Sequence, residues 1–270
     1  MILASVSGMS LWLPLLAALS YAVPAAAAAQ ISPVAARAVL VAAWLLHAVV
    51  LASGLLGEVP HFGFAPALSV TAWLVLTVYA VEIQVFPNLR VRWALTCLGS
   101  FAVLLALAFP GQPLQSAASP WFALHLALGV ACYGLFGAAV VHAWLMTRSE
   151  KQMRLASEAP TGVPLLTLER LTFRFVAAGF VLLSATLLAG LLFGEALYGK
   201  ASAGLTMKWD HKAVFSVLSW LTFACLLVGR ARFGWRGRKA VRVLYLGAGL
   251  LLLAYTGSRF VGEVILGRAV

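Results

Sequence analysis

Long apolar runs alternate with short polar segments along the 270-residue chain. A helix needs roughly 20 apolar residues to cross the hydrocarbon core of a bilayer, so each run is a candidate membrane span. Eight runs fall at about 8–29, 38–56, 67–85, 93–109, 121–146, 175–194, 213–229 and 243–266. The pattern predicts an all-α, polytopic transmembrane helical bundle of about eight spans. The first and fourth runs are the weakest candidates, because Pro14 and Pro24 interrupt the first and the fourth is short.

The composition excludes a soluble protein. Hydrophobic residues make up 63% of the chain and charged residues 10%, whereas a soluble domain is about half apolar and about a quarter charged. We therefore expect residues 1–270 to form a single integral membrane domain. The first apolar run ends in AAAAAQ, as in a signal peptide, but the first basic residue is Arg37. Because a basic n-region is missing, we expect this run to be retained as a helix.

The formal net charge of +11 is concentrated in short segments between the apolar runs. This clustering is typical of membrane orientation, so we do not expect nucleic-acid binding. Fourteen of the 19 basic residues lie in alternate loops, on one side of the predicted bundle: Arg37, Arg90, Arg92, Arg148, Lys151, Arg154, Arg170, Arg174, Arg230, Arg232, Arg236, Arg238, Lys239 and Arg242. The positive-inside rule places this side in the cytoplasm and both termini on the outer side.

Several common chemistries have no support in the sequence. Cys97, Cys132 and Cys225 each lie inside an apolar run and form no CxxC pair, which argues against a disulfide framework, a zinc site or a thiol-redox role. We expect them to be buried small hydrophobic residues. A Gly-rich phosphate loop, a GxSxG elbow and an HExxH motif are also missing. We therefore predict no catalytic residues of a hydrolase or a nucleotide-dependent enzyme.

Two histidines inside predicted spans are candidates for a buried site, because ionisable groups within a membrane are costly and are usually functional. His47 lies midway along the second run, where it can ligate a metal or haem or can hydrogen-bond to a neighbouring helix. His125 lies near the start of the fifth run, on nearly one helical face with Gly129 and Tyr133. The small Gly129 lets a flat or bulky group approach His125, although a glycine there also suits helix packing.

Polar groups gather in TMKWDHKAVFSVLSW, residues 206–220, where the seventh span begins. His211 falls on the same outer side as His125. Two imidazoles that enter a bundle from one side can ligate a single iron axially. Lys208 and Lys212 are suited to pair with haem propionates.

The same segment also has a simpler interpretation, which spacing alone favours. Asp210 is well placed as the N-cap of a helix, Trp209 suits the membrane interface, and lysines there can snorkel to water. Trp209, Ser216 and Trp220 recur on one helical face. Such a face usually serves packing, but it can also form the wall of a site for a flat aromatic cofactor.

Four segments carry a resemblance to a known family. MKWDHKAVFSVLSW and the following GWRGRKAVRVLYLGAGLLLLAYTGSRFVGEVILGR resemble the cytochrome c assembly protein family, the CcsA/CcmC-type haem-handling membrane proteins. The nearest likeness is to its HemX/YpjD-like branch of eight-span inner-membrane proteins. ALHLALGVACYGLF and LTLERLTFRF resemble that branch too. The likeness covers about residues 38–268 and is strongest over about 120–268.

The resemblance implies that haem is exposed at the outer face of the bacterial inner membrane, against a Trp-rich segment. In the family, two histidines on flanking helix ends ligate the iron. His125 matches the first of these ligands. Trp209, Asp210 and Lys212 match the end of the Trp-rich segment, and His211 stands where the family has proline.

The sequence departs from the family pattern at the second histidine. That position falls near YTGSRF, where Ser258 or Arg259 stands. The alternatives are that His211 supplies the second ligand, that Arg259 binds a propionate, or that the haem function is lost or altered. His47 corresponds to the buried histidine that some members use for a haem inside the bundle.

These features predict a haem-binding, haem-handling membrane protein of cytochrome c biogenesis, and not an enzyme in the usual sense. The expected cofactor is haem b, with His125 as one axial ligand and His211 or His47 as the other. Apocytochrome c and other biogenesis proteins are the expected partners, within the lipid bilayer. The other residues expected at the haem or its propionates are Trp209, Asp210, Trp220, Lys208, Lys212 and Arg259.

Two other classes of function stay open at this point. One is a membrane scaffold or regulatory protein without a cofactor. The other is a small-solute or ion transporter that uses Glu82 and His47. Hydropathy supports all three functions equally. His61 and His142 lie near the aqueous ends, where histidines are often incidental, and are weaker candidates.

Overall fold

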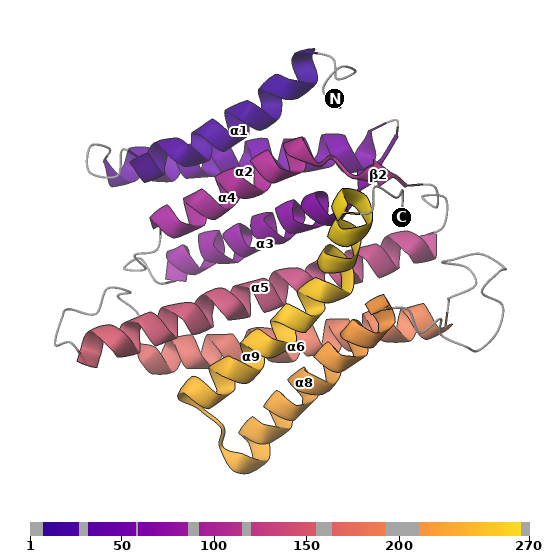
Figure 1. Ribbon diagram of the computed structural model, residues 1–270. Coiled ribbons are helices and arrows are strands. Elements are labelled where there is room, and N and C mark those ends of the chain that lie inside the picture. Colours follow the sequence, from indigo (N-terminus) through magenta and orange to yellow (C-terminus); the bar gives the residue numbers. More distant parts are fainter. Residues whose placement is uncertain are drawn as a thin grey trace. The chain divides into compact units, whose positions relative to one another are not determined.

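The computed structural model describes residues 8–26, 32–57, 59–85, 92–114, 120–154, 164–192 and 211–265. Helices make up nearly all of these segments (Figure 1). They are α1 (Gly8–Ala26), α2 (Pro33–Leu56), α3 (Phe64–Val85), α4 (Arg92–Ala108), α5 (Pro120–Arg154), α6 (Leu165–Leu192), α8 (His211–Phe233) and α9 (Gly237–Leu252). The last helix continues as η3 (Leu253–Gly257, π-helical), α10 (Ser258–Phe260) and η4 (Val261–Ile265, π-helical). The predicted all-α fold is confirmed.

Each of the eight apolar runs coincides with one of these helices. Among the described residues, six helices are long and apolar enough to cross a membrane: α2, α3, α5, α6, α8 and the helix that begins with α9. The apolar stretches of α1 and α4, Leu11–Pro24 and Thr96–Ala108, are shorter. These two belong to the runs that the sequence marked as weakest. The chain is therefore a multi-pass membrane protein, and the total of eight spans stays a prediction.

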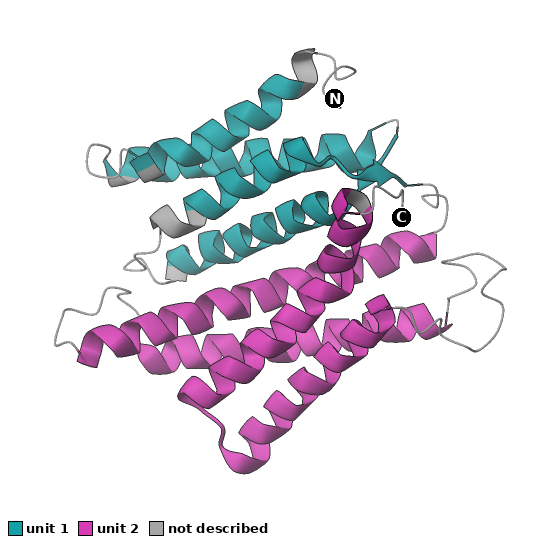
Figure 2. Ribbon diagram, viewed as in Figure 1, with its two compact units in different colours: residues 1–84, 90–114 teal, residues 85–89, 115–270 magenta. Residues whose placement is uncertain are grey.

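The helices group into two compact units (Figure 2). Unit 1 comprises residues 1–84 and 90–114 and contains α1 to α4. Unit 2 comprises residues 85–89 and 115–270 and contains α5 and the helices that follow. In unit 1, β1 (His61–Phe62) pairs antiparallel with β2 (Gln112–Pro113). This short ladder joins the connection between α2 and α3 to the segment that follows α4.

Polar side chains from three helices meet inside unit 1. His47 on α2 is 0% exposed. Its Nε2 lies 2.9 Å from Ser69 Oγ on α3, and its Nδ1 lies 3.4 Å from the Tyr21 hydroxyl on α1. One turn of α2 earlier, the Trp44 ring stacks on Trp73 of α3 with 5.0 Å between centroids. Because buried polar atoms are costly unless they are hydrogen-bonded, these contacts explain how a histidine fits inside an apolar bundle.

The interior of unit 2 is built around two stacked rings. Phe136 on α5 and Phe223 on α8 lie 3.8 Å apart between centroids, at an interplanar angle of 7°. A Cβ added at Gly179 of α6 would lie 3.1 Å from the Phe136 ring, and one at Gly247 of α9 would lie 2.8 Å from Phe223. Both helices therefore approach the stacked rings at a residue without a side chain. The Ser219 hydroxyl adds a hydrogen bond of 2.8 Å to the Gly247 carbonyl.

Two details differ from the expectations. The sixth apolar run, predicted at about 175–194, belongs to a longer helix that includes LTLERLTFRF, because α6 runs unbroken from Leu165 to Leu192. Among the cysteines, Cys132 is buried as expected, whereas Cys97 and Cys225 are exposed. The prediction of burial was wrong for these two because an apolar run does not reveal which face of a membrane helix points outward.

Candidate functional site

His125 lies in the second turn of α5 and faces α6. A Cβ added at Gly190 of α6 would lie 3.5 Å from His125 Cε1, so the imidazole reaches the backbone of that helix. Its Nδ1 is buried and has no hydrogen-bond partner within the described part of the chain. Leaving a buried polar atom unpaired costs about 1–3 kcal/mol, so a ligand or water that paired with it would stabilise this region. Among the predicted ligands, His125 therefore has a buried ring nitrogen that no hydrogen bond from the described residues satisfies.

Gly129 contributes less to this site than its position predicted. A Cβ there would lie 3.8 Å from Thr186 Cγ2, which is an ordinary van der Waals distance. The glycine is therefore compatible with close packing of α5 on α6. Its surroundings do not require a residue without a side chain.

A contact between α5 and α9 relates His125 to the C-terminal part of the chain. The Tyr133 hydroxyl on α5 donates a hydrogen bond to the Leu251 carbonyl on α9. The two helices run in opposite directions, and the continuation of α9 lies toward the start of α5 (Figure 1). His125 is two turns before Tyr133, about 12 Å along the helix. His125 and the π-helical segment η3 therefore lie toward the same end of unit 2.

Thr256 in η3 is a second buried polar group that lacks a partner. Its Oγ1 makes no hydrogen bond to any residue that the structure describes. Thr172, Thr186 and Thr222 instead donate to the carbonyl four residues earlier, each at 2.8 Å. π-Helical turns are rare and often lie at functional sites. No pattern in the sequence points to Thr256, because a threonine in an apolar helix normally donates its hydroxyl to the backbone of its own helix.

The two residues at the family's second histidine position differ in what their side chains do. The Ser258 hydroxyl donates to the carbonyls of Ala254 and Tyr255, at 3.1 Å and 2.9 Å. It is therefore committed to the helix backbone. The guanidinium carbon of Arg259 lies 5.8 Å from the centroid of the Tyr255 ring, and the residue is half-buried. Of the two, Arg259 alone brings a charge toward this end of unit 2.

The residues of the KWDHK segment fall partly outside the described residues. Trp209 and Asp210 are among those not described, as is Lys208. His211 is the first residue of α8 and is exposed, and Lys212 follows it as a half-buried residue. α8 begins at the end of unit 2 where α5 begins, so His211 and His125 lie toward the same end of that unit (Figure 1).

Trp220 packs between α8 and α6. Its Nε1–H donates a hydrogen bond of 2.8 Å to Ser184 Oγ, and its ring stacks on Phe180 at 5.3 Å between centroids. His125 instead approaches α6 beside Gly190, on the side of that helix that also carries Thr186. Residues 184 and 186 are about 200° apart around a helix, so Trp220 and His125 contact different faces of α6. The packing interpretation explains Trp220, and its predicted role as a wall of the haem site stays a prediction.

His47 has a hydrogen-bond partner at each ring nitrogen, Ser69 and Tyr21. The geometry therefore supports the alternative in which this histidine joins neighbouring helices. His47 belongs to unit 1 and His125 to unit 2. Among the described residues, no group of three or more His, Cys, Asp or Glu side chains could hold a metal ion.

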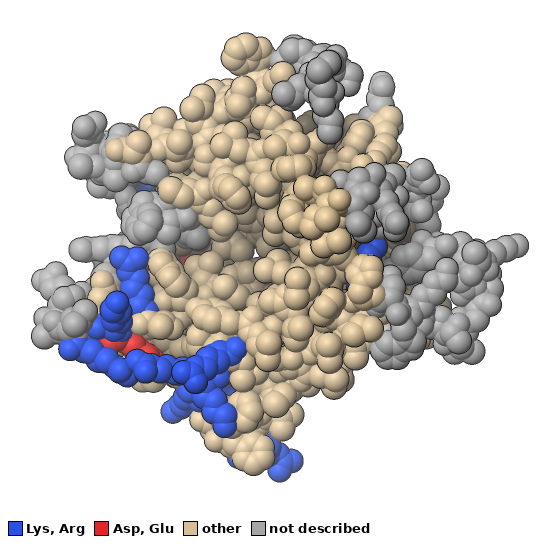
Figure 3. Space-filling model, in the orientation of Figure 1, with Lys and Arg blue, Asp and Glu red and all other residues tan. Residues whose placement is uncertain are grey.

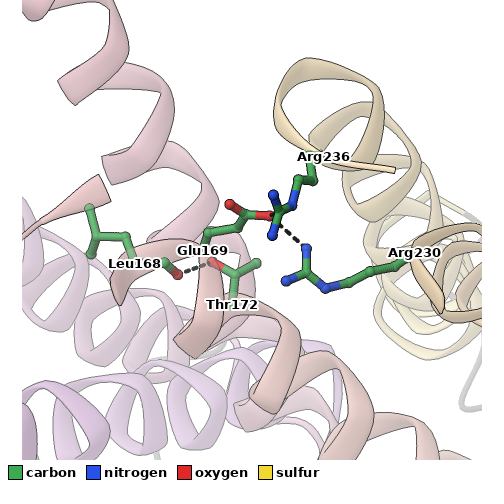
Figure 4. A network of polar contacts seen from close by, with 5 residues as sticks. All are labelled: Leu168, Glu169, Thr172, Arg230 and Arg236. Atoms are coloured by element: carbon green, nitrogen blue, oxygen red, sulfur yellow. Dashed lines mark hydrogen bonds and ion pairs between the residues drawn. The ribbon is translucent and has the colours of Figure 1, made fainter. Parts of the chain in front are cut away.

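The sequence did not single out an ionic cluster at the other end of unit 2. Glu169 on α6 accepts a hydrogen bond of 2.6 Å from Arg230 Nη1 at the end of α8 (Figure 4). Arg236 Nε, in the turn between α8 and α9, lies 3.3 Å from the same carboxylate oxygen. Thr172, one turn further along α6, donates to the Leu168 carbonyl. Glu169 is the one acidic residue within ERLTFR, and this could have indicated an ion pair. The basic residues around it suggested only the orientation of the chain in the membrane.

The chain is similar to known proteins along most of its length. The sequence model of the cytochrome C assembly protein family matches residues 4–266. An uncharacterized 28.8 kDa protein of Azospirillum brasilense is 30% identical over 214 residues, which cover 74% of this chain and 76% of that protein. Inner membrane protein YpjD of Escherichia coli K12 is 30% identical over 153 residues, or 55% of this chain and 54% of YpjD.

One relative whose name states a function has a lower sequence identity to this chain than the two proteins above. Cytochrome c biogenesis protein CcsA of Synechococcus sp. (strain CC9605) is 26% identical over 239 residues, which cover 76% of each chain. No solved structure matches the chain. The family match includes the N-terminal part, where the resemblance of individual segments was weak. Because that match extends over nearly the whole chain, the protein belongs to the cytochrome c assembly protein family.

Proposed function

We propose that this protein binds haem b during cytochrome c biogenesis and holds it at the outer face of the inner membrane. Membership of the cytochrome c assembly family supports a role in cytochrome c biogenesis. The observation that carries the haem proposal is the buried His125 Nδ1, which has no hydrogen-bond partner in the described segments. Histidine nitrogens are common axial ligands of haem iron. His125 fits this role because the residue is half-buried and its buried Nδ1 has no partner among the described residues.

The residues of this chain would bind and orient the haem. His211 is the better second ligand, because it lies toward the same end of unit 2 as His125, whereas both nitrogens of His47 are hydrogen-bonded. Arg259 and Lys212 supply positive charge for the propionates, with Lys208 as a further candidate. When bound, haem supplies the porphyrin that is to be delivered to apocytochrome c. Delivery requires a partner protein that presents the apocytochrome.

The remaining features of the proposal concern the wall of the site and its side of the membrane. Trp209, Asp210 and Trp220 are proposed to border the haem. The bundle is proposed to have eight spans, with both termini on the outer side of a bacterial inner membrane. The relative named inner membrane protein YpjD supports this location.

The absorption spectrum of the purified protein tests the proposal. Full-length protein produced with haem supplied should show a Soret band, and His125→Ala should bind haem about tenfold more weakly or worse, the scale on which changes at metal sites act. Free imidazole should restore the band in His125→Ala if the lost group was an axial ligand. His211→Ala should shift or weaken the band if His211 is the second ligand.

A matched histidine removal separates ligation from general damage. His61 lies on β1 in unit 1, where its Nδ1 contacts the Val59 carbonyl at 2.6 Å, and His61→Ala should leave the Soret band unchanged. A wild-type protein without a Soret band would contradict haem binding and favour the cofactor-free scaffold. Solute flux in liposomes that depends on Glu82 would favour the transporter instead.

A further inference from the structure

The turn between α8 and α9 has a defined shape at one end of unit 2. Gly234 follows α8 with φ +63°, and its N–H donates to the Arg230 carbonyl at 3.2 Å. This is the αL motif that commonly ends a helix. Gly237 also has a positive φ, +56°, where α9 begins. The two glycines let the chain reverse within three residues between the two helices, so the turn stays close to both.

Trp235 is held in this turn by contacts on its ring. A Cβ added at Gly229 of α8 would overlap the Trp235 ring, so the indole lies directly against the helix backbone. The Trp235 N–H also donates to the Gly229 carbonyl at 3.1 Å. Lys239 Nζ lies 3.9 Å from the centroid of the Trp235 ring, a cation–π distance. The indole and the ammonium are thus positioned together.

A recess of about 630 Å³ opens at this turn. It is lined by Phe233, Gly234, Trp235, Arg236 and Lys239. The side chain of Arg236 is 67% exposed although its Nε contacts Glu169, so its guanidinium still offers N–H donors outward. The recess therefore combines an aromatic ring with two cations that can meet an anion.

The surroundings of the recess are strongly basic. Glu169 shares one oxygen between Arg230 and Arg236, so the three side chains carry a net positive charge. Figure 3 shows Lys and Arg side chains gathered where the ends of these helices lie. The exposed basic residues at the end of α8 and in the first turns of α9 are Arg232, Arg236, Arg238, Lys239 and Arg242. The Glu169 and Glu150 carboxylates lie near the turn, but the basic residues outnumber them, so an anion at the recess would enter a predominantly positive field.

We propose that this recess binds the headgroup of an anionic phospholipid. It lies at the ends of two helices that are long and apolar enough to cross a membrane, which is the level of the headgroups. Arg236 and Lys239 meet the phosphodiester, and Trp235 borders it as tryptophan does at membrane interfaces. Phe233 is 73% exposed at the rim and offers an apolar surface to the acyl chains. This combination distinguishes a lipid from a free phosphate, which has no acyl chain.

Native mass spectrometry of the full-length protein in detergent tests this proposal. The protein is titrated separately with dioleoyl phosphatidylglycerol, dioleoyl phosphatidylcholine and inorganic phosphate. Phosphatidylglycerol should bind at least about tenfold more tightly than phosphatidylcholine. The double variant Arg236→Gln/Lys239→Gln should reduce that affinity about 25-fold, because each of the two basic residues near a lipid headgroup contributes about fivefold. The single variant Lys239→Gln, which leaves Glu169 paired, should show part of the same loss.

The matched control removes two charges from α6. Arg170 and Arg174 are exposed and do not line the recess, so Arg170→Gln/Arg174→Gln should keep the wild-type affinity for phosphatidylglycerol. Equal losses in the two double variants would overturn the proposal, because they would indicate a diffuse charge effect. Displacement of the lipid by inorganic phosphate at the same concentration would overturn it as well.

Discussion

His47 and His125, the two candidate histidines within predicted spans, differ in what their ring nitrogens contact. In His47, Ser69 and Tyr21 engage the two nitrogens, and the residue is fully buried in unit 1. In His125, Nδ1 is buried beside α6 and lacks a partner among the described residues. Hydrogen bonds of this kind fix a side chain, whereas an unpaired buried nitrogen favours the arrival of a ligand. The same residue type therefore supports structure in one unit and, in our proposal, ligation in the other.

Replacing His47 should reduce stability and leave haem binding unchanged. His47→Ala leaves the Ser69 and Tyr21 hydroxyls without their partner and opens a cavity between α1, α2 and α3, so the expected cost is about 2–4 kcal/mol. The measurement is thermal unfolding of the purified protein in detergent, together with its Soret absorbance. His47→Gln, which can still donate and accept hydrogen bonds, should lose less stability. Loss of the Soret band in His47→Ala without a lower Tm would show instead that His47 is a haem ligand.

At the scale of elements, Glu169 connects three parts of unit 2. It lies near the start of α6 and pairs with Arg230 at the end of α8 and with Arg236 in the following turn. The guanidinium carbon of Arg230 also lies 3.7 Å from the centroid of the Phe173 ring on α6. The Glu169 side chain is only 11% exposed, compared with 28% for Arg230 and 67% for Arg236. The inner pair is thus shielded from water and the outer pair is not.

This difference in exposure predicts unequal costs of substitution. Glu169→Gln leaves two guanidiniums without their anion, one of them largely buried, and should destabilise the protein by about 1–3 kcal/mol. Arg236→Gln removes the exposed partner only and should cost less than about 1 kcal/mol. Thermal unfolding of both variants in the same detergent provides the comparison. A cost for Arg236→Gln equal to that for Glu169→Gln would show that the outer pair contributes as much as the inner one.

At the scale of the whole molecule, the sequence predicted which segments are helices but not what their polar residues contact. Hydropathy located the eight long helices of the described residues, because each apolar run must satisfy its backbone inside a membrane. Partnerships such as His47 with Tyr21 join residues 26 positions apart and depend on packing that no local pattern encodes. Glu169 was overlooked because its partners follow 61 and 67 residues later. Thr256 was overlooked because a π-helical turn has no recognised sequence signal.

The orientation and number of spans remain predictions, and fusions of alkaline phosphatase, which is active only on the outer side, can check them. With both termini outside and eight spans, fusions after Gln112 and after Val270 should be active, and a fusion after Gly234 should be inactive. The basic residues at the end of α8 and the start of α9 favour retention of that turn in the cytoplasm. The fusion after Gln112 tests α4 directly, since the apolar part of that helix is shorter than a full span.

Green fluorescent protein, which fluoresces only on the inner side, should give the opposite pattern at each position. Activity after Gly234 and none after Val270 would place His125 and His211 toward the cytoplasm, where delivery of haem to an outer-face apocytochrome would not be possible from this site.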